Sequence, residues 1–324
     1  MNKVFLFAIA TSLMMVSCGG GSQSEESKDS NELKGEVIID GSSTVYPLTE
    51  AIAEEFQMQN PGVKVKVSFS GTGGGFKKFL RGETHINDAS RPIKESEKQT
   101  AQEAGIEYLE FEVGRDGITV VVNPQNDWVD YLTVEELRKI WAPESQGVIA
   151  SWSQVRDGFP DEKLSLYGPG TASGTFDFFT EAVLGESGKS RGDYIASEDD
   201  NVLVQGVSGD KGGLGYFGYA YYEENKNKLK AVPIKADENS EPVLPTPETI
   251  RSGEYKPLSR PLFLYVRKDA LKNPAVAEFV KFYLQNVETL APQVGFVPPA
   301  HETIERQLKE LEQAIQEVQQ NQTS

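Results

Sequence analysis

The chain has 324 residues, and its acidic side chains outnumber the basic ones by 49 to 32, which gives a formal net charge of −17. This charge opposes nucleic acids and acidic membrane surfaces as partners, although a local cluster of donors can still hold a small anion. The single cysteine excludes an internal disulfide. With only two histidines as well, we expect no His/Cys metal site, no Cys–His nucleophile pair and no cofactor.

The first 17 residues have the pattern of a signal peptide. Lys3 precedes a short apolar run, and Ser17 stands directly before Cys18. The run is too short and ends too abruptly for a lasting transmembrane helix. Cys18 stands where a bacterial lipoprotein carries its lipid; the alternative is a secreted protein whose cysteine is incidental. We therefore expect a signal peptide at 1–17, then a lipidated cysteine and a flexible tether at 18–34.

Three stretches of the body share one pattern: a short apolar strand, a loop rich in glycine and hydroxyl residues, and an amphipathic helix. The expected strands are 37–40, 63–69 and 164–167, and the helices after them begin near Pro47, Phe76 and Phe178. Such units indicate α/β architecture with parallel strands, whose ligands gather at the carboxyl ends of the strands. Free N–H groups at the helix N-termini can hold an anion there, and ordinary capping is the alternative.

The remaining pattern adds strands and helices on either side of these units. We expect further strands at 117–122, 229–234 and 261–266, a helix at 133–141 capped by Thr133, and an amphipathic helix at 303–319 that packs on the body. The polar, proline-rich stretch 235–248 is expected to be a surface loop. For 205–222, a ligand-facing loop followed by a buried strand is one interpretation that the pattern leaves open.

Several short motifs are weak on their own. The run from Gly71 to Lys77 is not a Walker loop, because Phe76 stands where that motif has its second glycine. Arg91 precedes a proline and is expected on an extended segment, where its guanidinium suits an oxyanion; a surface arginine is the alternative. His85 is expected to be structural, and the Arg-Gly-Asp triplet at 191–193 is expected to arise by chance.

Five motifs in a fixed order resemble the phosphate-binding proteins of bacterial high-affinity phosphate ABC transporters: GSSTVYP, SFSGTGGG, DASRPI, LYGPGTASGTFDFFTEA and SEDDNVLVQGVSGDKGGLGYFGYAYY. The resemblance covers nearly all residues from about 36 to 300. It implies a type II periplasmic-binding-protein fold, an α/β fold of two lobes that are joined by two crossovers and enclose a ligand cleft. We place lobe I at 35–121 plus 262–324 and lobe II at 122–261, with crossovers at Val121–Val122 and Arg260–Pro261.

The resemblance also implies a set of phosphate ligands, carried over motif by motif: Ser43, Thr44, Val45, Thr72, Ser90, Arg91, Ser173, Gly174 and Thr175. The better-known branch of the family has an arginine where Pro169 stands here, so Arg91 is the natural substitute and Arg191 a weaker one. That branch has an aspartate in place of Ser90, which accepts the phosphate proton and so excludes sulfate. Asp88 could take that role here, and Asp177 competes for it.

The function implied is that of a monomeric, lipid-anchored receptor outside the cytoplasm, periplasmic in a Gram-negative cell. It would capture inorganic phosphate by cleft closure and deliver it to the permease subunits of an ABC transporter, without enzymatic activity. A receptor for sulfate, molybdate or arsenate is the alternative among binding proteins. The other alternative is a serine hydrolase or phosphatase that uses Ser173, but Thr171 replaces the first glycine of GxSxG, and only His85 and His301 could serve as base.

Overall fold

The computed structural model describes residues 32–171, 173–197 and 199–320. Contacts divide the chain into a short N-terminal unit, 1–32, and one compact unit from Leu33 to Ser324, and the fold below is that of the second unit. Cys18, the expected signal peptide and most of the expected tether lie outside the described residues. No helix in the described part is long and apolar enough to cross a membrane.

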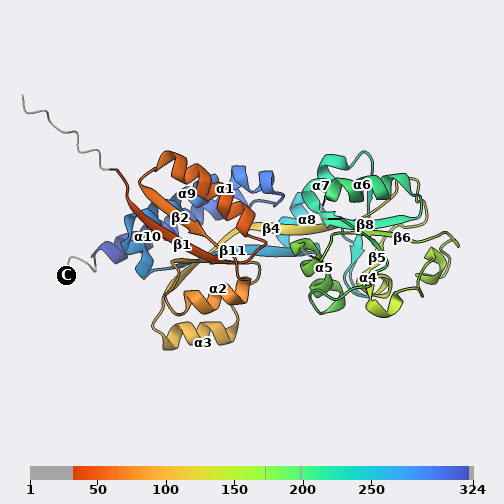
Figure 1. Ribbon diagram of the computed structural model, residues 1–324, viewed down its shortest axis with the longest axis horizontal. Helices are drawn as coiled ribbons and strands as arrows, with labels where there is room; N and C mark the ends of the chain where they lie inside the picture. Colours follow the sequence, from red (N-terminus) through yellow and green to blue (C-terminus); the bar gives the residue numbers. More distant parts are fainter. Residues whose placement is uncertain (1–31, 172, 198, 321–324) are drawn as a thin grey trace, which may run out of the picture. The chain divides into compact units, whose positions relative to one another are not determined.

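Strands and helices alternate along most of the compact unit (Figure 1). The strands are β1 (Gly35–Gly41), β2 (Val63–Val67), β3 (Ile86–Ala89), β4 (Tyr108–Val122), β5 (Leu132–Thr133), β6 (Ser165–Gly168), β7 (Ile195–Ala196), β8 (Gly213–Gly218), β9 (Lys230–Ala231), β10 (Ile234–Lys235) and β11 (Ser259–Arg267). The α-helices are α1 (Tyr46–Gln59), α2 (Thr72–Phe79), α3 (Glu95–Glu103), α4 (Val134–Trp141), α5 (Gly174–Leu184), α6 (Asp200–Gly209), α7 (Tyr219–Asn225), α8 (Pro247–Ser252), α9 (Pro274–Leu290) and α10 (His301–Gln320).

The main sheet runs in the order β2-β1-β3-β11-β4-β8-β6-β7, with β9 also paired to β4. At one end β1 pairs in parallel with β2 and β3, and at the other β6 pairs in parallel with β7 and β8. Between them β4 and β11 run antiparallel to each other over nine residue pairs. The parallel units confirm the predicted α/β architecture, while the antiparallel centre is a feature that the sequence pattern did not indicate.

A first hydrophobic core surrounds the β1–β2–β3 end of the sheet. Helices α1, α9 and α10 pack on one face, where Phe56 and Phe279 are almost wholly buried. Helices α2 and α3 pack on the other face, where Phe76 and Tyr265 have ring centroids 4.9 Å apart. Figure 1 shows α2 and α3 on the opposite side of the strands from α1 and α9. Ile304 and Leu311 of α10 belong to this core, which confirms that the C-terminal helix packs on the body.

A second core lies around β6 and β8. Trp141 of α4, Phe179 of α5 and Tyr216 of β8 form its aromatic centre, and the rings of Phe179 and Tyr216 stack at 3.7 Å. Thr133 caps α4 as predicted, since its hydroxyl accepts a hydrogen bond from the N–H of Glu136. Helix α6 covers the opposite face of β8 with a smaller apolar cluster.

The two cores are linked by β4 and by the segment that leads into β11. Along β4, Val113 belongs to the first core and Ile118 to the second. Leu258, which directly precedes β11, belongs to the second core, and Leu262 of β11 belongs to the first. Along β4 the change of core therefore lies between 113 and 118, before Val121 and Val122, which pair with β8. The expected crossovers at Val121–Val122 and Arg260–Pro261, and the lobe boundaries drawn from them, stay predictions.

Two predicted elements have different bounds in the structure. Helix α2 begins at Thr72 rather than Phe76, so the three glycines 73–75 form its first turn instead of a loop. The expected strand 229–234 is split into β9 and β10 around Pro233, because proline has no N–H to donate to a strand ladder.

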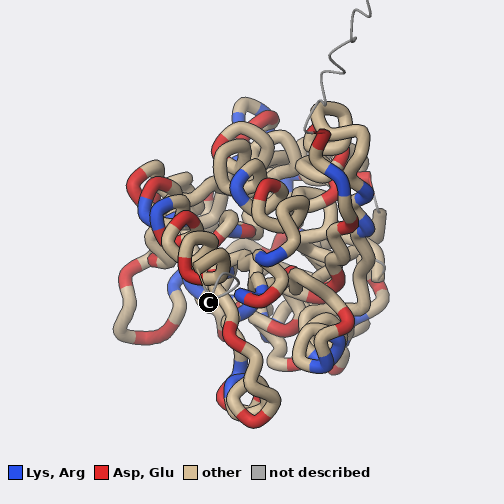
Figure 2. The backbone as a smooth tube through the Cα atoms, turned by 90° about the vertical axis from the view of Figure 1, so that its left-hand side faces the viewer, with Lys and Arg blue, Asp and Glu red and all other residues tan. Residues whose placement is uncertain are grey.

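Viewed from the end that holds the first core, acidic and basic positions are interspersed along the backbone (Figure 2).

Candidate functional site

The loop between β1 and α1 contains three of the predicted site residues. Ser43 is exposed, Thr44 is half-buried, and Val45 is a buried N-cap that offers no side-chain oxygen to the helix. The N–H of Ser42 donates to the carbonyl of Asp88 at 2.9 Å, which holds the loop against the end of β3. The first turn of α1 has no side-chain cap: the N–H of Tyr46 donates to the carbonyl of Ser42, that of Leu48 donates to the carbonyl of Val45, and Pro47 has no N–H.

The start of α2 is joined to the end of β3. The hydroxyl of Thr72, the first residue of α2, accepts a hydrogen bond from the N–H of Ser90 at 3.1 Å and lies 3.2 Å from the Ser90 hydroxyl. No side chain caps this helix, since its N-cap is Gly71. Two hydroxyl groups and a helix N-terminus thus lie together, as the sequence predicted, and each can donate to an anion.

Arg260 of β11 joins this region to the second core. Its Nη2 donates to the hydroxyl oxygen of Thr44 at 2.9 Å, and Nε and Nη2 donate to Oδ2 of Asp116 on β4 at 3.2 and 3.1 Å. The guanidinium carbon lies 4.0 Å from the ring centre of Phe178 on α5. The side chains of Arg260 and Asp116 are 14% and 10% exposed. The fold therefore holds one largely buried guanidinium between the β1–α1 loop and α5.

A cavity of about 290 Å³ opens beside Arg260. Three of the predicted residues line it, together with Arg260 and the exposed side of α5: Thr72, Ser90, Arg91, Phe178, Glu181, Ala182 and Arg260. The donors that face it are hydroxyls, guanidinium groups and the N-terminus of α2. This donor set suits a small oxyanion. The role of Arg260 was missed at the sequence level, where this residue was only part of a crossover.

The start of α5 lies next to the β1–α1 loop. Ser173 is the N-cap of α5 and accepts a hydrogen bond from the N–H of Thr175 at 3.2 Å. A methyl group on Gly174 would stand 3.5 Å from the hydroxyl oxygen of Thr44. The helix N-termini of α1 and α5 therefore converge from the two cores, although Ser173, Gly174 and Thr175 do not themselves line the cavity.

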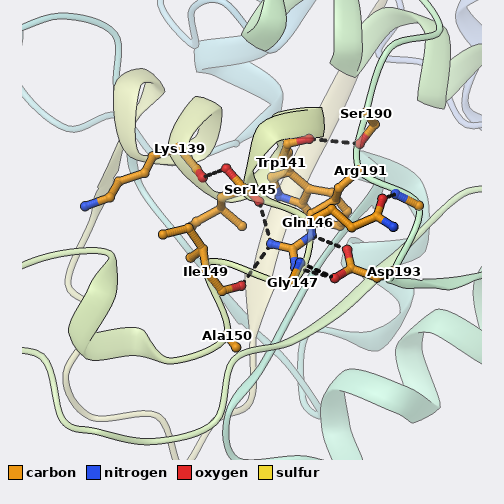
Figure 3. Close-up of polar contacts among 12 residues, drawn as sticks. Lys139, Trp141, Ser145, Gln146, Gly147, Ile149, Ala150, Ser190, Arg191 and Asp193 are labelled. Atoms are coloured by element: carbon orange, nitrogen blue, oxygen red, sulfur yellow. Dashed lines mark hydrogen bonds and ion pairs between the residues drawn. The ribbon is translucent and has the colours of Figure 1, made fainter.

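The other two candidate arginines, like Arg260, have carboxylate partners, but theirs engage both terminal nitrogens or are accompanied by further internal contacts. Arg91 donates to both carboxylate oxygens of Glu97, at 2.9 and 2.8 Å. Arg191, 5% exposed, forms a two-point ion pair with Asp193 and also donates to the carbonyls of Ile140 and Ile149 (Figure 3). Arg191 thus anchors the end of α4 and does not line this cavity, while its part in phosphate binding stays a prediction. The Arg-Gly-Asp triplet is part of this internal network.

Neither predicted proton acceptor faces the cavity. Asp88 is 1% exposed and lies beside Thr49 of α1 and Tyr283 of α9. Burial raises its pKa to about 8, the Thr49 hydroxyl opposes this increase, and the Asp40 carboxylate adds to it. The raised pKa favours the protonated form of Asp88 at neutral pH, and its role as proton acceptor stays a prediction. Asp177 is exposed in the first turn of α5 and does not line the cavity.

Neither histidine lies at Ser173 to serve as base for a serine nucleophile. His85 accepts a hydrogen bond from the N–H of Ile38 on β1 at 3.1 Å, as expected of a structural histidine. His301 pairs with Glu288 on the far side of the first core. The Ser173 hydroxyl accepts the hydrogen bond that caps α5, and neither imidazole has a contact with it.

Comparisons with known proteins agree with this architecture. A family model described as a PBP superfamily domain matches residues 25–287. The chain is 52% identical over 263 residues to Protein SphX of Synechocystis sp., which covers 81% of this chain and 78% of SphX. It is 42% identical over 316 residues to the phosphate-binding protein PstS of Staphylococcus saprophyticus, covering 95% and 94% of the two chains. The crystal structure of a possible phosphate binding protein from Planctomyces limnophilus matches with a TM-score of 0.82 and 50% identity, covering 87% of this chain and 99% of that one.

Proposed function

The chain belongs to the PBP superfamily and, within it, to the family of phosphate-binding proteins, and on this premise we propose that it is a receptor for inorganic phosphate. Its fold is the type II periplasmic-binding-protein fold. The receptor works outside the cytoplasm and delivers phosphate to the permease subunits of an ABC transporter. It is not an enzyme, and it acts as a monomer.

The observation that carries this proposal is the position of Arg260. Its guanidinium contacts the β1–α1 loop and α5 at once, and it lines a cavity with the hydroxyls of Thr72 and Ser90. Phosphate in this cavity receives charge-assisted hydrogen bonds, which are about twice as strong as neutral ones. The segments that begin α1 and α5 add donors as the cleft closes, through the N–H groups of Val45 and Gly174 and the hydroxyls of Thr44 and Thr175. The N–H groups of Thr44 and Thr175 already donate to the hydroxyls of Ser42 and Ser173.

Asp116 is the positioning residue for Arg260. Asp116 accepts two hydrogen bonds from the guanidinium of Arg260, and the flat face of that guanidinium lies over the ring of Phe178. Because Asp116 lies on β4 and Arg260 on β11, the pair joins the two strands that run between the cores. Bending at this point moves the two sides of the cleft together, so ligand binding at Arg260 is coupled to closure.

The membrane attachment is proposed from the sequence alone. Cys18 follows a signal-peptide pattern and carries the lipid, and the polar stretch after it tethers the receptor to the membrane. The lobes, lobe I at 35–121 plus 262–324 and lobe II at 122–261, close about the strands β4 and β11. The change of core between Val113 and Ile118 favours an earlier first boundary.

Titration calorimetry of the full chain, solubilised in detergent, tests the ligand. We expect phosphate to bind at micromolar concentration or below, with sulfate, molybdate and arsenate titrated in parallel. Saturable binding of sulfate or molybdate without phosphate binding would refute the assignment and favour another tetrahedral oxyanion. A phosphatase and esterase assay on the same sample is expected to give no turnover, and a rate that depends on Ser173 would instead establish the hydrolase alternative.

A further inference from the structure

A second cavity lies beside the candidate site, on the other side of the first turn of α2. It has a volume of about 560 Å³ and runs between α2 and α3, and we call it the α2–α3 groove. Four basic side chains line it: Lys77, Arg81, Arg91 and Lys94. Arg91 lines both this groove and the smaller cavity next to Arg260, so the two are neighbours along one surface.

The charges in the α2–α3 groove do not cancel. Glu97 neutralises Arg91, and Glu83 neutralises Arg81 at 2.6 Å. Neither Lys77 nor Lys94 has an ion-pair partner within the described residues, and both are exposed. The groove therefore carries two uncompensated positive charges.

This local charge stands against the charge of the whole chain. Far from the surface the chain acts as a single charge, and its net charge of −17 repels an approaching anion. The Debye length is about 8 Å at physiological ionic strength, so a small basic patch controls the potential close to the surface. Clefts lined by one sign of charge raise the local concentration of the opposite ion and its rate of association.

We propose that the α2–α3 groove is an outer anion-collecting site, in which Lys77 and Lys94 attract phosphate from solution and pass it to the neighbouring cavity. This inference rests on the proposed function. The lysines act before the ligand reaches Arg260, so they increase the association rate and leave the dissociation rate unchanged. The α2–α3 groove distinguishes ligands by charge alone, and the cavity beside Arg260 distinguishes one anion from another.

The test is the rate of phosphate association in the Lys77→Gln/Lys94→Gln double variant. Rates are measured by stopped-flow intrinsic fluorescence of the full chain in detergent, with dissociation constants from calorimetry. At about 10 mM salt, where the Debye length is about 30 Å, we expect association to slow by about 3- to 10-fold with an unchanged dissociation rate. At about 1 M salt the difference from the wild type is expected to disappear.

The matched control is Lys272→Gln/Lys309→Gln. These lysines are exposed on the α9–α10 side of the first core, and the double variant changes the net charge by the same amount. We expect it to slow association less than half as much as the groove variant. Equal association rates for both double variants at every salt concentration would overturn the proposal. A loss of affinity that results from faster dissociation of phosphate would overturn it too. If the wild type binds no phosphate by calorimetry, the proposed function itself fails.

Discussion

Asp88 makes the stability of this protein depend on pH in a direction opposite to that of most carboxylates. It lies in the first core on β3, next to Asp40 on β1, Thr49 on α1 and Tyr283 on α9. Burial raises its pKa from 3.8 to about 8, with the Thr49 hydroxyl opposing and Asp40 adding to the increase. The other charge next to it, Asp40, is paired with Lys78 at 2.6 Å.

The sign and size of the effect follow from this shift. Between the two pKa values the folded chain binds a proton at Asp88 that the unfolded chain has released, so the free energy of unfolding falls as pH rises. A shift of about four units corresponds to about 5 to 6 kcal/mol, or about 1.4 kcal/mol per pH unit between pH 4 and pH 8. The loss is complete above about pH 8, where Asp88 is ionised in both states.

The Asp88→Asn variant removes this titration. We measure the free energy of unfolding with urea from pH 5 to pH 9. As pH rises over this range, we expect the value for the variant to increase relative to that of the wild type by several kcal/mol. The new buried amide changes the free energy of unfolding by an amount that does not depend on pH, so it does not alter how the difference between variant and wild type varies with pH. Asp177→Asn, at an exposed aspartate, is the control and should follow the wild type. Parallel profiles for the wild type and Asp88→Asn would refute the reasoning.

Three further predictions concern the network of Arg191, the start of α5 and the anchor. Arg191→Ala removes a buried ion pair and two carbonyl contacts, so the free energy of unfolding should fall by about 3 kcal/mol, and a fall below about 1 kcal/mol in urea denaturation would contradict this. Because Arg191 lowers the pKa of Asp193 from 3.8 to about 2, the stability from this pair should be fully present above the ordinary aspartate pKa and be lost progressively as pH falls from there through about 2. Ser173→Ala/Thr175→Ala should weaken phosphate binding at least tenfold for each donor lost, and an unchanged calorimetric affinity would remove α5 from the site. Cys18→Ser should release the protein from membranes, and wild-type fractionation of this variant with membranes would refute lipidation.

The local pattern predicted most of the strand–loop–helix units, because hydrophobic periodicity and capping residues act within a few residues of each other. Thr133 and the apolar stripe of α10 are examples. Helix α2 began earlier than predicted because packing outweighed the low helix propensity of its glycines. A methyl group on Gly75 would stand 2.5 Å from Gly41 Cα, so only glycine lets α2 approach β1. Helix α9, which supplies much of the first core, was not predicted.

The central arginine could not be predicted from local pattern, because its partners are far apart in the chain. Thr44, Asp116 and Phe178 come from three separate parts of the sequence and meet only at Arg260. Arg91 looked like the better candidate, since it precedes a proline next to a hydroxyl motif. Its pairing with Glu97, six residues later, was not considered. The burial of Asp88 could not be predicted for the same reason, since alternation along a strand does not show which face a neighbouring helix covers.

The most direct test of this account is the calorimetric affinity for phosphate of Arg260→Gln beside that of Arg91→Gln. Arg260→Gln removes the guanidinium that lies between the β1–α1 loop and α5, and hydrogen bonds to charged groups contribute about 1.5–3 kcal/mol each. We therefore expect the dissociation constant to rise by about 10- to 100-fold in Arg260→Gln. Glu97 takes both terminal nitrogens of Arg91, whereas the hydrogen bonds of Arg260 to Asp116 and Thr44 use only Nε and Nη2, so Arg91→Gln should change the constant by less than about threefold. A large loss of affinity in Arg91→Gln with wild-type binding in Arg260→Gln would contradict the central claim.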